Sequence, residues 1–443
     1  MSMMRPLTCA ALALSLTGQA LAENEKVMAG DSIGKWLDEN LKHRFVVLGM
    51  ATQTQPNYDS SININNDLLG IEKSALEAQI KADFELKREI FSLTMKPRYR
   101  HQTLWLEEGF NGSSSKRQDR LFINEWSLDI KPDPSVVIGY GREVRQWGPS
   151  LFMNLSNPFL LDNGRNNPYQ ELGGTDFLRI AHLPSYNLSY SLIANVSRGE
   201  AEARPDGFKQ TYALQTEYSG VDFSLGGILS KRVENNPRLG LYGQWTANEA
   251  VILYGELSTG SGRTGCYIHD DASSPIELTF ECGQQKSSKL YTNWLTGASY
   301  TLLGGGTINL EYAHYAEGYS SDEFNQLTLL NQSLQGYILG GNANADLASY
   351  LVARSTSPGL QHLRQNYLFF SYIHNNIINQ VDINLRYALG IDDGSSQIIG
   401  ILDWYVRDDM KLFVLGSKSL GPKNGEFKYF IKSQLYVGFE AYH

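Results

Sequence analysis

The sequence predicts an all-β protein: a transmembrane antiparallel β-barrel of about 18 strands (16–18), with short periplasmic turns and long extracellular loops. Three observations lead to this prediction: apolar and polar residues alternate over ten or more positions, short and long connections alternate, and an export signal begins the chain. The composition agrees, because only 19% of the residues are charged while Gly and Tyr number 41 and 25.

The export signal occupies residues 1–22. A basic start at Arg5 precedes an apolar run over residues 7–16, and Ala20-Leu21-Ala22 forms a cleavage site before Glu23. The apolar run is too short to span a bilayer as a helix, which requires about 20 residues. We therefore expect cleavage near Ala22 and localisation in the outer membrane of a Gram-negative bacterium.

Residues 23–43 are predicted to form a short periplasmic segment before the barrel. Ile33, Trp36, Leu37 and Leu41 recur at spacings of three and four, as on one face of an amphipathic helix. Two interpretations stay open for this segment, a short helix or a loosely ordered leader.

Residues 44–443 carry the strand pattern. In residues 75–87 every second position is apolar and the positions between them are Glu, Gln, Lys or Asp; residues 379–390 repeat the pattern. Period two over ten residues is the length that a tilted membrane strand needs. The expected strands begin near residues 44, 74, 89, 120, 136, 176, 188, 211, 221, 238, 251, 290, 306, 361, 378, 397, 410 and 427.

The connections between these strands alternate in length. Short ones, such as residues 87–88, 184–187 and 407–409, alternate with long polar ones, such as residues 148–175, 260–288 and 317–360. This asymmetry is typical of outer-membrane barrels with both termini in the periplasm, and it implies an even number of strands. A β-propeller is disfavoured because no repeat of about 40 residues is present.

Several function classes are excluded by charge and by motif. The net charge of −9 and the pI near 5.5 lack the basic excess of a nucleic-acid-binding protein. His182, His314 and His374 lie on predicted strands without a nearby nucleophile or acid that would single them out. We expect no enzymatic activity, no cofactor and no metal.

Charged residues on the inward faces are the candidate channel lining. In residues 89–105 the apolar side chains occupy one face, so Lys96, Arg98 and Arg100 share the other. Opposed rows of cations and anions would create a transverse field that orders polar solutes, but salt-bridged ladders that stiffen the wall are the alternative. The candidates are Lys96, Arg98, Arg100, Glu125, Asp129, Arg142, Glu143, Arg145, Arg165, Arg179, Asp382 and Arg386.

The long connection after residue 147 is predicted to fold into the bore. Three prolines restrict its path, and it carries apolar residues that require cover from solvent. Its candidate aromatic residues are Trp147, Phe152, Phe159 and Tyr169. We expect Arg145, Arg165 and Arg179 to lie near one constriction together with Arg98 and Arg100.

Two cysteines remain after the signal is removed. Cys266 and Cys282 lie in one polar segment of an exported protein, so a disulfide within one loop is expected. A metal site is the weaker option, because only His269 accompanies them.

The mature chain resembles Gram-negative outer-membrane porins in architecture along its whole length. Within it, Trp147-Gly148-Pro149-Ser150 and Leu155-Ser156-Asn157 resemble a segment of the Wzi capsule-assembly barrels, with Ser150 in place of a Gly. The porin resemblance implies a channel for small polar solutes, anionic or saccharide-like. The Wzi resemblance implies an alternative, a barrel that binds or exports a surface polysaccharide, with loop aromatics including Tyr319 and Tyr337 as stacking surfaces. Outer-membrane lipid, lipopolysaccharide and the membrane-assembly machinery are the expected partners.

Overall fold

The computed structural model describes residues 40–443 apart from residues 61–62, 64–65, 67–68, 107–114, 161–163, 165–166, 275–277 and 286. The predicted signal peptide and nearly all of the predicted periplasmic segment lie outside these residues. No helix in the described ranges is long and apolar enough to cross a membrane.

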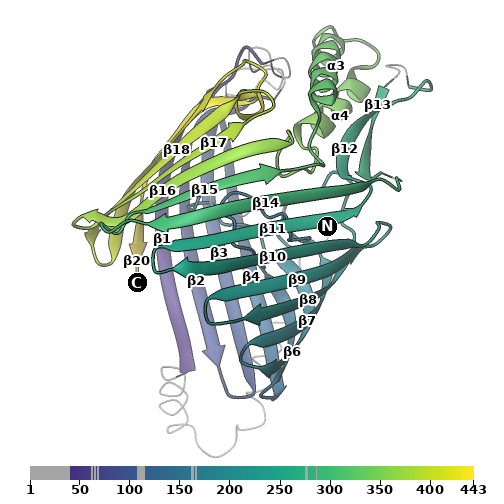
Figure 1. Cartoon of the computed structure of the whole chain (residues 1–443). Helices are drawn as coiled ribbons and strands as arrows, with labels where there is room; N and C mark the ends of the chain where they lie inside the picture. Colours follow the sequence, from purple (N-terminus) through teal and green to yellow (C-terminus); the bar gives the residue numbers. More distant parts are fainter. Residues whose placement is uncertain are drawn as a thin grey trace, which may run out of the picture.

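The described chain forms an 18-stranded antiparallel barrel, which confirms the predicted fold class (Figure 1). Each wall strand pairs with the next one along the chain, and β1 pairs with β20 to close the ring. The wall strands are β1 (Leu41–Pro56), β2 (Glu72–Lys87), β3 (Phe91–Leu106), β4 (Ser115–Asp133), β5 (Val136–Glu143), β6 (Thr175–Ser185), β7 (Leu188–Ser197), β8 (Thr211–Ser219), β9 (Phe223–Arg232), β10 (Arg238–Asn248), β11 (Val251–Ser261), β14 (Leu290–Thr301), β15 (Thr307–His314), β16 (Asn366–Ile378), β17 (Val381–Gly390), β18 (Ser396–Arg407), β19 (Met410–Leu420) and β20 (Ile431–Tyr442).

The alternation in sequence becomes a two-faced wall. On β2, Leu76 and Ile80 are about half exposed on the outer surface, whereas Gln79 and Lys81 are buried toward the lumen. Exposed leucine, isoleucine, valine and aromatic side chains recur on the same outer face of other strands. An apolar outside and a polar inside are the arrangement of a barrel whose solvent is lipid.

The two ends of the barrel differ in their connections. At one end, here the turn end, the strands join through short turns, and β1 begins and β20 finishes there. The turn before β15 uses Gly305 at φ +90°, a backbone conformation that favours glycine, and Leu302 N–H donates to the Gly306 carbonyl at 2.7 Å. The long connections gather at the opposite end, the loop end.

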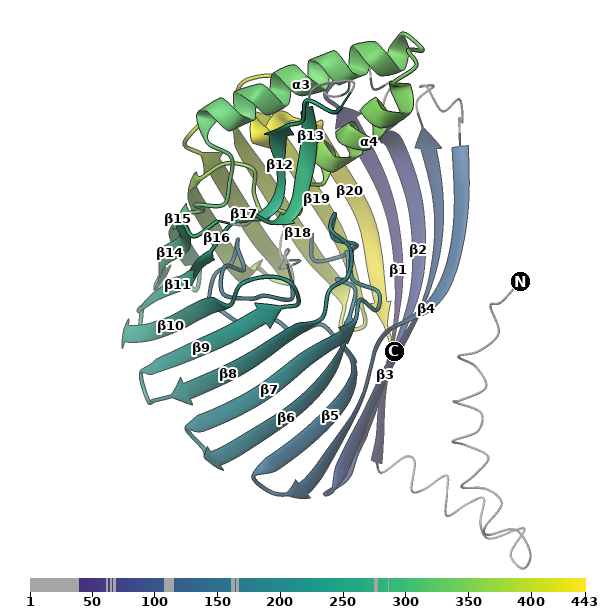
Figure 2. The same cartoon turned by 90° about the vertical axis from the view of Figure 1, so that its right-hand side faces the viewer.

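Two long connections at the loop end fold into one structure, here the cap. It consists of the hairpin β12 (Thr264–Asp270) and β13 (Leu278–Gln284) with the helices α3 (Ser321–Leu339) and α4 (Ala345–Thr356) (Figure 2). Buried side chains from all these elements share one apolar core. The short 3-10 helix η2 (Glu426–Lys428) precedes β20, and Tyr429 next to it contacts Phe324 of α3.

Sequence and structure differ at several places. β1 and β4 begin at Leu41 and Ser115, before the expected starts near residues 44 and 120, whereas β16 and β20 begin at Asn366 and Ile431, after the expected starts near residues 361 and 427. Residues 260–288 and 317–360, expected to be plain loops, contain the cap, because their apolar residues bury one another instead of meeting solvent. The predicted disulfide between Cys266 and Cys282 is present and joins β12 to β13.

Candidate functional site

The described residues of segment 144–174, here the inward loop, leave the end of β5 and enter the lumen (Figure 2). Trp147 meets Phe159 edge to face at 5.8 Å between ring centroids, and Phe159 meets Phe177 of β6 at 4.9 Å. These rings pack on inward apolar residues of the neighbouring strands. The loop is therefore anchored first on the wall strands that follow it in the sequence, beginning with β6.

The Trp-Gly-Pro corner reaches the wall formed by β11 and β15. Glu256 of β11 accepts hydrogen bonds from the Ser150 N–H at 3.2 Å and from the Ser156 N–H and hydroxyl at 3.2 and 3.1 Å. A Cβ on Gly148 (φ +87°) would lie 2.3 Å from Glu256 Oε1, so this close approach requires glycine.

A second buried carboxylate completes this clamp. Glu311 of β15 accepts from the Ser150 hydroxyl at 2.7 Å, the Leu151 N–H at 2.8 Å and the Tyr254 hydroxyl at 2.9 Å. Both Glu256 and Glu311 are at most 4% exposed. Because buried carboxylates are costly without donors, these hydrogen bonds fix the loop to this wall.

Two aromatic residues anchor the loop further. Phe152 stacks at 4.6 Å on Phe369 of β16, the Cα partner of Glu311, and so packs beside the clamp. At the far end of the loop, Tyr169 stacks on Phe413 of β19 at 3.6 Å and donates its hydroxyl to Asp403. All four candidate loop aromatics thus pack inside the barrel, and the loop crosses the lumen from one wall to another.

The candidate charges on β3 and β4 face the lumen and are paired. Lys96 and Glu125 are Cα partners joined at 2.8 Å. Arg98 is 3% exposed and contacts Asp83 at 2.8 Å and Glu171 of the inward loop at 2.7 Å. These pairs are the salt-bridged ladder that the sequence left as one of two interpretations.

The same pairing continues along β3 and into β5 and β6. Arg100 lies 3.9 Å from Glu77, Arg145 lies 2.6 Å from Glu143, and Arg179 lies 3.0 Å from Asp129. The last pair spans Gly139 of the intervening strand, where a Cβ would lie 2.2 Å from Asp129 Oδ1.

Three further candidates lie apart from this group. Arg142 and Glu143 are neighbours on β5, so their side chains point to opposite faces of the wall. Arg142 pairs with Asp176 at 2.7 Å and with Glu200 at 3.5 Å. Asp382 accepts from the Asn376 N–H at the turn end, and Arg386 lies 5.9 Å from the Phe152 ring centre. Arg165 lies outside the described residues, so the expected grouping of Arg145, Arg165 and Arg179 at one constriction stays a prediction.

A group of basic residues that the sequence analysis did not select lines a cavity of about 90 Å³ beside the inward loop. We call it the basic pocket; its arginines are Arg204 from the β7–β8 connection, Arg232 of β9 and Arg238 of β10. The carboxylate of Glu317 and a set of neutral hydrogen-bonding side chains also line it: Ser156, Asn157, Thr211, Ser230, Asn235, Asn236, Ser258, Thr264, Asn293, Tyr315 and Gln361.

Two of these arginines are held by carboxylates. Arg232 binds Asp206 through both terminal nitrogens, at 2.6 and 3.0 Å, and Arg238 binds Glu317 at 2.9 Å through each. Glu317 also accepts from Asn293 and from Thr264, so it ties the pocket to the start of the cap. Bidentate pairs of this kind fix the arginine planes.

Arg204 is different. Its guanidinium donates to the Pro158 carbonyl at 3.1 Å and forms no ion pair with any carboxylate in the described part of the chain. Removal from water and then repulsion by Arg232 lower the pKa of Arg204 to about 10, which leaves it charged at neutral pH. It therefore retains donors for an anion that enters the pocket.

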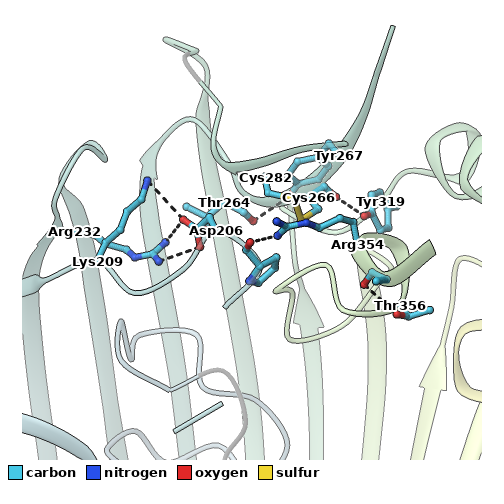
Figure 3. The surroundings of a disulfide bond; sticks show 12 residues. Asp206, Lys209, Arg232, Thr264, Cys266, Tyr267, Cys282, Tyr319, Arg354 and Thr356 are labelled. Atoms are coloured by element: carbon cyan, nitrogen blue, oxygen red, sulfur yellow. Dashed lines mark hydrogen bonds and ion pairs between the residues drawn. A yellow bond between two sulfur atoms is a disulfide. The ribbon is translucent and has the colours of Figure 1, made fainter. Parts of the chain in front are cut away.

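The cap holds the segment that carries Arg204. Arg354 of α4 donates to the Pro205 carbonyl, and Figure 3 shows Arg354 beside the disulfide, with Asp206, Lys209 and Arg232 gathered nearby. Tyr267 of β12 donates to the Glu317 carbonyl at 2.7 Å. The only sequence sign of this arrangement is the density of Arg198, Arg204 and Lys209 in one connection.

No protein-family model and no curated protein sequence matches the chain. Solved structures do. Pseudomonas aeruginosa OccK11 (OpdR) is 10% identical with a TM-score of 0.51, over 91% of this chain and 96% of that one. Acinetobacter baumannii OccAB1 is 9% identical with a TM-score of 0.55 over 91% and 96% of the two chains, and P. aeruginosa OccK8 (OprE) is 10% identical with a TM-score of 0.53 over 91% and 98%. These comparisons do not support the resemblance to the Wzi barrels. The chain shares the fold of the Occ outer-membrane barrels.

Proposed function

We propose that the protein is an outer-membrane channel through which small anionic solutes diffuse, with the turn end in the periplasm and the loop end outside. It is a passive channel without enzymatic activity. Arg204 carries the proposal, because it is a charged arginine that forms no ion pair with a described carboxylate, whereas the other two arginines of the same cavity, Arg232 and Arg238, are paired. The inward loop narrows the passage, so a solute must pass close to these groups.

The solute class follows from the donors. Arg204, Asn235 and Gln361 offer N–H groups that suit a carboxylate or a small oxyanion. Arg198 lines an adjoining cavity together with Arg204, Arg232, Lys209 and one carboxylate, Glu202. Lys209 is paired with Glu234 at 2.8 Å, so Arg198 is the residue that extends the positive region toward the loop end. One similar structure, P. aeruginosa OpdK, is described with vanillate, an aromatic carboxylate.

The alternative function, binding or export of a surface polysaccharide, is less well supported. It requires exposed aromatic surfaces, yet Phe152, Tyr169 and Tyr319 are buried in packing contacts. The proposal also includes removal of residues 1–22 and insertion by the membrane-assembly machinery into a bilayer of lipid and lipopolysaccharide. A mature protein beginning at Glu23, seen by intact mass, tests the first of these points.

Planar-bilayer recording tests the channel itself. We expect discrete conductance steps, a reversal potential in a KCl gradient that reports preference for chloride, and current reduction by benzoate but not by glucose. Absence of steps from protein with heat-modifiable migration, or equal interference by the sugar and the carboxylate, contradicts the proposal.

A further inference from the structure

An outward-facing aromatic cluster lies at the loop ends of β14 and β15. Trp294 and His314 are Cα partners, and the Trp294 ring lies 5.3 Å from Tyr312 and 6.2 Å from His314. These residues alternate with Leu295 and Ala313, which are buried on the lumen side. Aromatic residues at the ends of the outer face mark the boundary between hydrocarbon and headgroups.

A pocket of about 450 Å³ lies next to this cluster, between the rim of the barrel and the start of α3. Its volume is within the range of small-molecule sites, roughly 300–1,000 Å³. The lining residues are Arg263, Lys289, Leu290, Tyr291, His314, Ala316, Ser320, Glu323 and Gln365.

Three basic side chains meet a single carboxylate in this pocket. Arg263 stacks over Tyr267 at 3.7 Å and pairs with Glu323, which fixes its position. Lys289 lies 5.1 Å from the Tyr291 ring centre and forms no ion pair within the described ranges. An ammonium held over a ring without a carboxylate retains its capacity for an anion.

His314 contributes a third polar group. Asn366 Nδ2 donates to Asp392, so the Asn366 oxygen is the acceptor for His314 Nδ1 at 2.9 Å. This hydrogen bond places the proton on Nδ1 and leaves Nε2 for a ligand. Nε2 is thus available to form a hydrogen bond with a phosphate oxygen.

We propose that this pocket binds a phosphate group on the sugar headgroup of an outer-leaflet glycolipid. The chemistry suits any phosphate monoester, but the position favours a lipid-borne one. Leu290, 62% exposed, lies beside Lys289, and the outward aromatic cluster adjoins the pocket, so acyl chains have an apolar surface directly next to the phosphate site. This proposal requires only that the barrel is inserted in the membrane. It does not depend on which solute diffuses through the lumen.

The test measures binding of diphosphoryl lipid A to the purified full-length barrel in detergent. We expect Lys289→Glu to weaken binding at least about tenfold, the size of one lost charge-assisted hydrogen bond. Lys131→Glu, an exposed lysine at the turn end of β4, makes the same charge change away from the pocket and should leave binding unchanged. Lys289→Gln serves as the milder variant if the reversal impairs folding, which heat-modifiable migration reports.

Two further ligands separate the possible phosphate sources. Dephosphorylated lipid A should bind at least about tenfold more weakly than the diphosphoryl form to the unmodified protein. Inorganic pyrophosphate should compete only at far higher concentration, because it lacks the acyl contact. Equal binding by the Lys289→Glu and Lys131→Glu variants overturns the site, and full competition by pyrophosphate at the lipid's own concentration overturns its assignment to a lipid. Conductance of the Lys289 variants should be unchanged, which keeps this test separate from the channel proposal.

Discussion

Two groups of basic residues face the lumen, and they differ in their partners. On β3 to β6, Lys96, Arg98 and Arg179 each contact a carboxylate of a nearby strand or of the inward loop. In the basic pocket, Arg232 and Arg238 are also paired, but Arg204 donates only to a backbone carbonyl among the described groups.

The presence or absence of a carboxylate partner therefore separates the charges that stabilise the structure from those that remain available to a solute. A buried arginine between two carboxylates is already satisfied, and its removal leaves buried charge behind. An arginine without a counter-ion contributes little to stability, and it attracts an anion more strongly than an arginine that is already paired with a carboxylate. Sequence position alone does not separate the two groups, since both are arginines on or near strands.

The largest expected effect comes from removing the carboxylates that hold the inward loop. Replacing Glu256 and Glu311 together by leucine leaves the donors of Ser150, Leu151, Ser156 and Tyr254 without acceptors. Five of the lost hydrogen bonds come from the inward loop, because Tyr254 lies on β11, and at about 1 kcal/mol each they account for roughly 5 kcal/mol of anchoring. Single-channel conductance should rise several-fold while the barrel stays heat-modifiable. An unchanged conductance means that the loop does not limit the passage.

Arg98→Met should have the next largest effect. It should destabilise the loop anchor by about 4 kcal/mol, because Glu171 is left without an ion-pair partner among the described residues, whereas Asp83 keeps Arg44. The temperature at which the detergent-solubilised barrel shifts to the unfolded band measures this change. Arg407→Met, which breaks a solvent-exposed pair with Asp409, is the control and should shift that temperature little. Equal shifts of the unfolding temperature in the two variants would mean that the buried pairs of Arg98 stabilise the protein no more than an exposed pair does.

Loss of the disulfide should come third and remain local. Replacing Cys266 and Cys282 by serine reopens a loop of 16 residues' separation, a change of about 3 kcal/mol in the chain-entropy description. We expect faster hydrogen exchange in β12, β13 and α4, with wall strands unaffected. Free thiols in correctly exported protein, detected by mass spectrometry, would show that the bridge is not formed.

The smallest energetic effect, about 1.4 kcal/mol, concerns Arg204 and tests the comparison directly. Arg204→Gln should lower the chloride-to-potassium permeability ratio about tenfold at low salt, and the effect should fade as the screening length shortens to about 3 Å at 1 M. Arg179→Gln makes the same charge change at a paired wall arginine and should shift the reversal potential less. A larger shift from Arg179 would place ion selectivity on the wall arginines and not in the basic pocket.

The wall was predictable from the sequence because its cause is local. Each strand alternates between lipid and lumen, so the pattern in residues 75–87 reports its own environment, and all 18 expected strands have counterparts in the structure. The short turns and the long loops could be predicted as well, because they are the segments that remain between the expected strands. The inward path of residues 144–174 could also be inferred, because Phe152 and Phe159 needed cover.

The cap and the basic pocket depend on contacts between distant segments, which periodicity does not report. A signal for α3 was present: Ser320 and Glu323 form a capping box before Phe324, Leu327 and Leu334. For Arg204 the decisive fact is the lack of a carboxylate partner, and this depends on where Asp206 and Glu317 direct their oxygens.

The pairing of β1 with β20 has a consequence for how the chain folds. Val46 pairs with Tyr442 and Gln55 with Ser433, so the last seam joins residues separated by almost the whole sequence. Bringing such distant segments together costs roughly 5 kcal/mol of chain entropy, by the logarithmic dependence on loop length. Until β20 has formed, β1 and β19 present unpaired backbone edges, which a lipid interior does not tolerate. Closure is therefore a late step, and a chaperone that shields β1 until the final strand arrives would raise the yield of inserted protein without changing its stability.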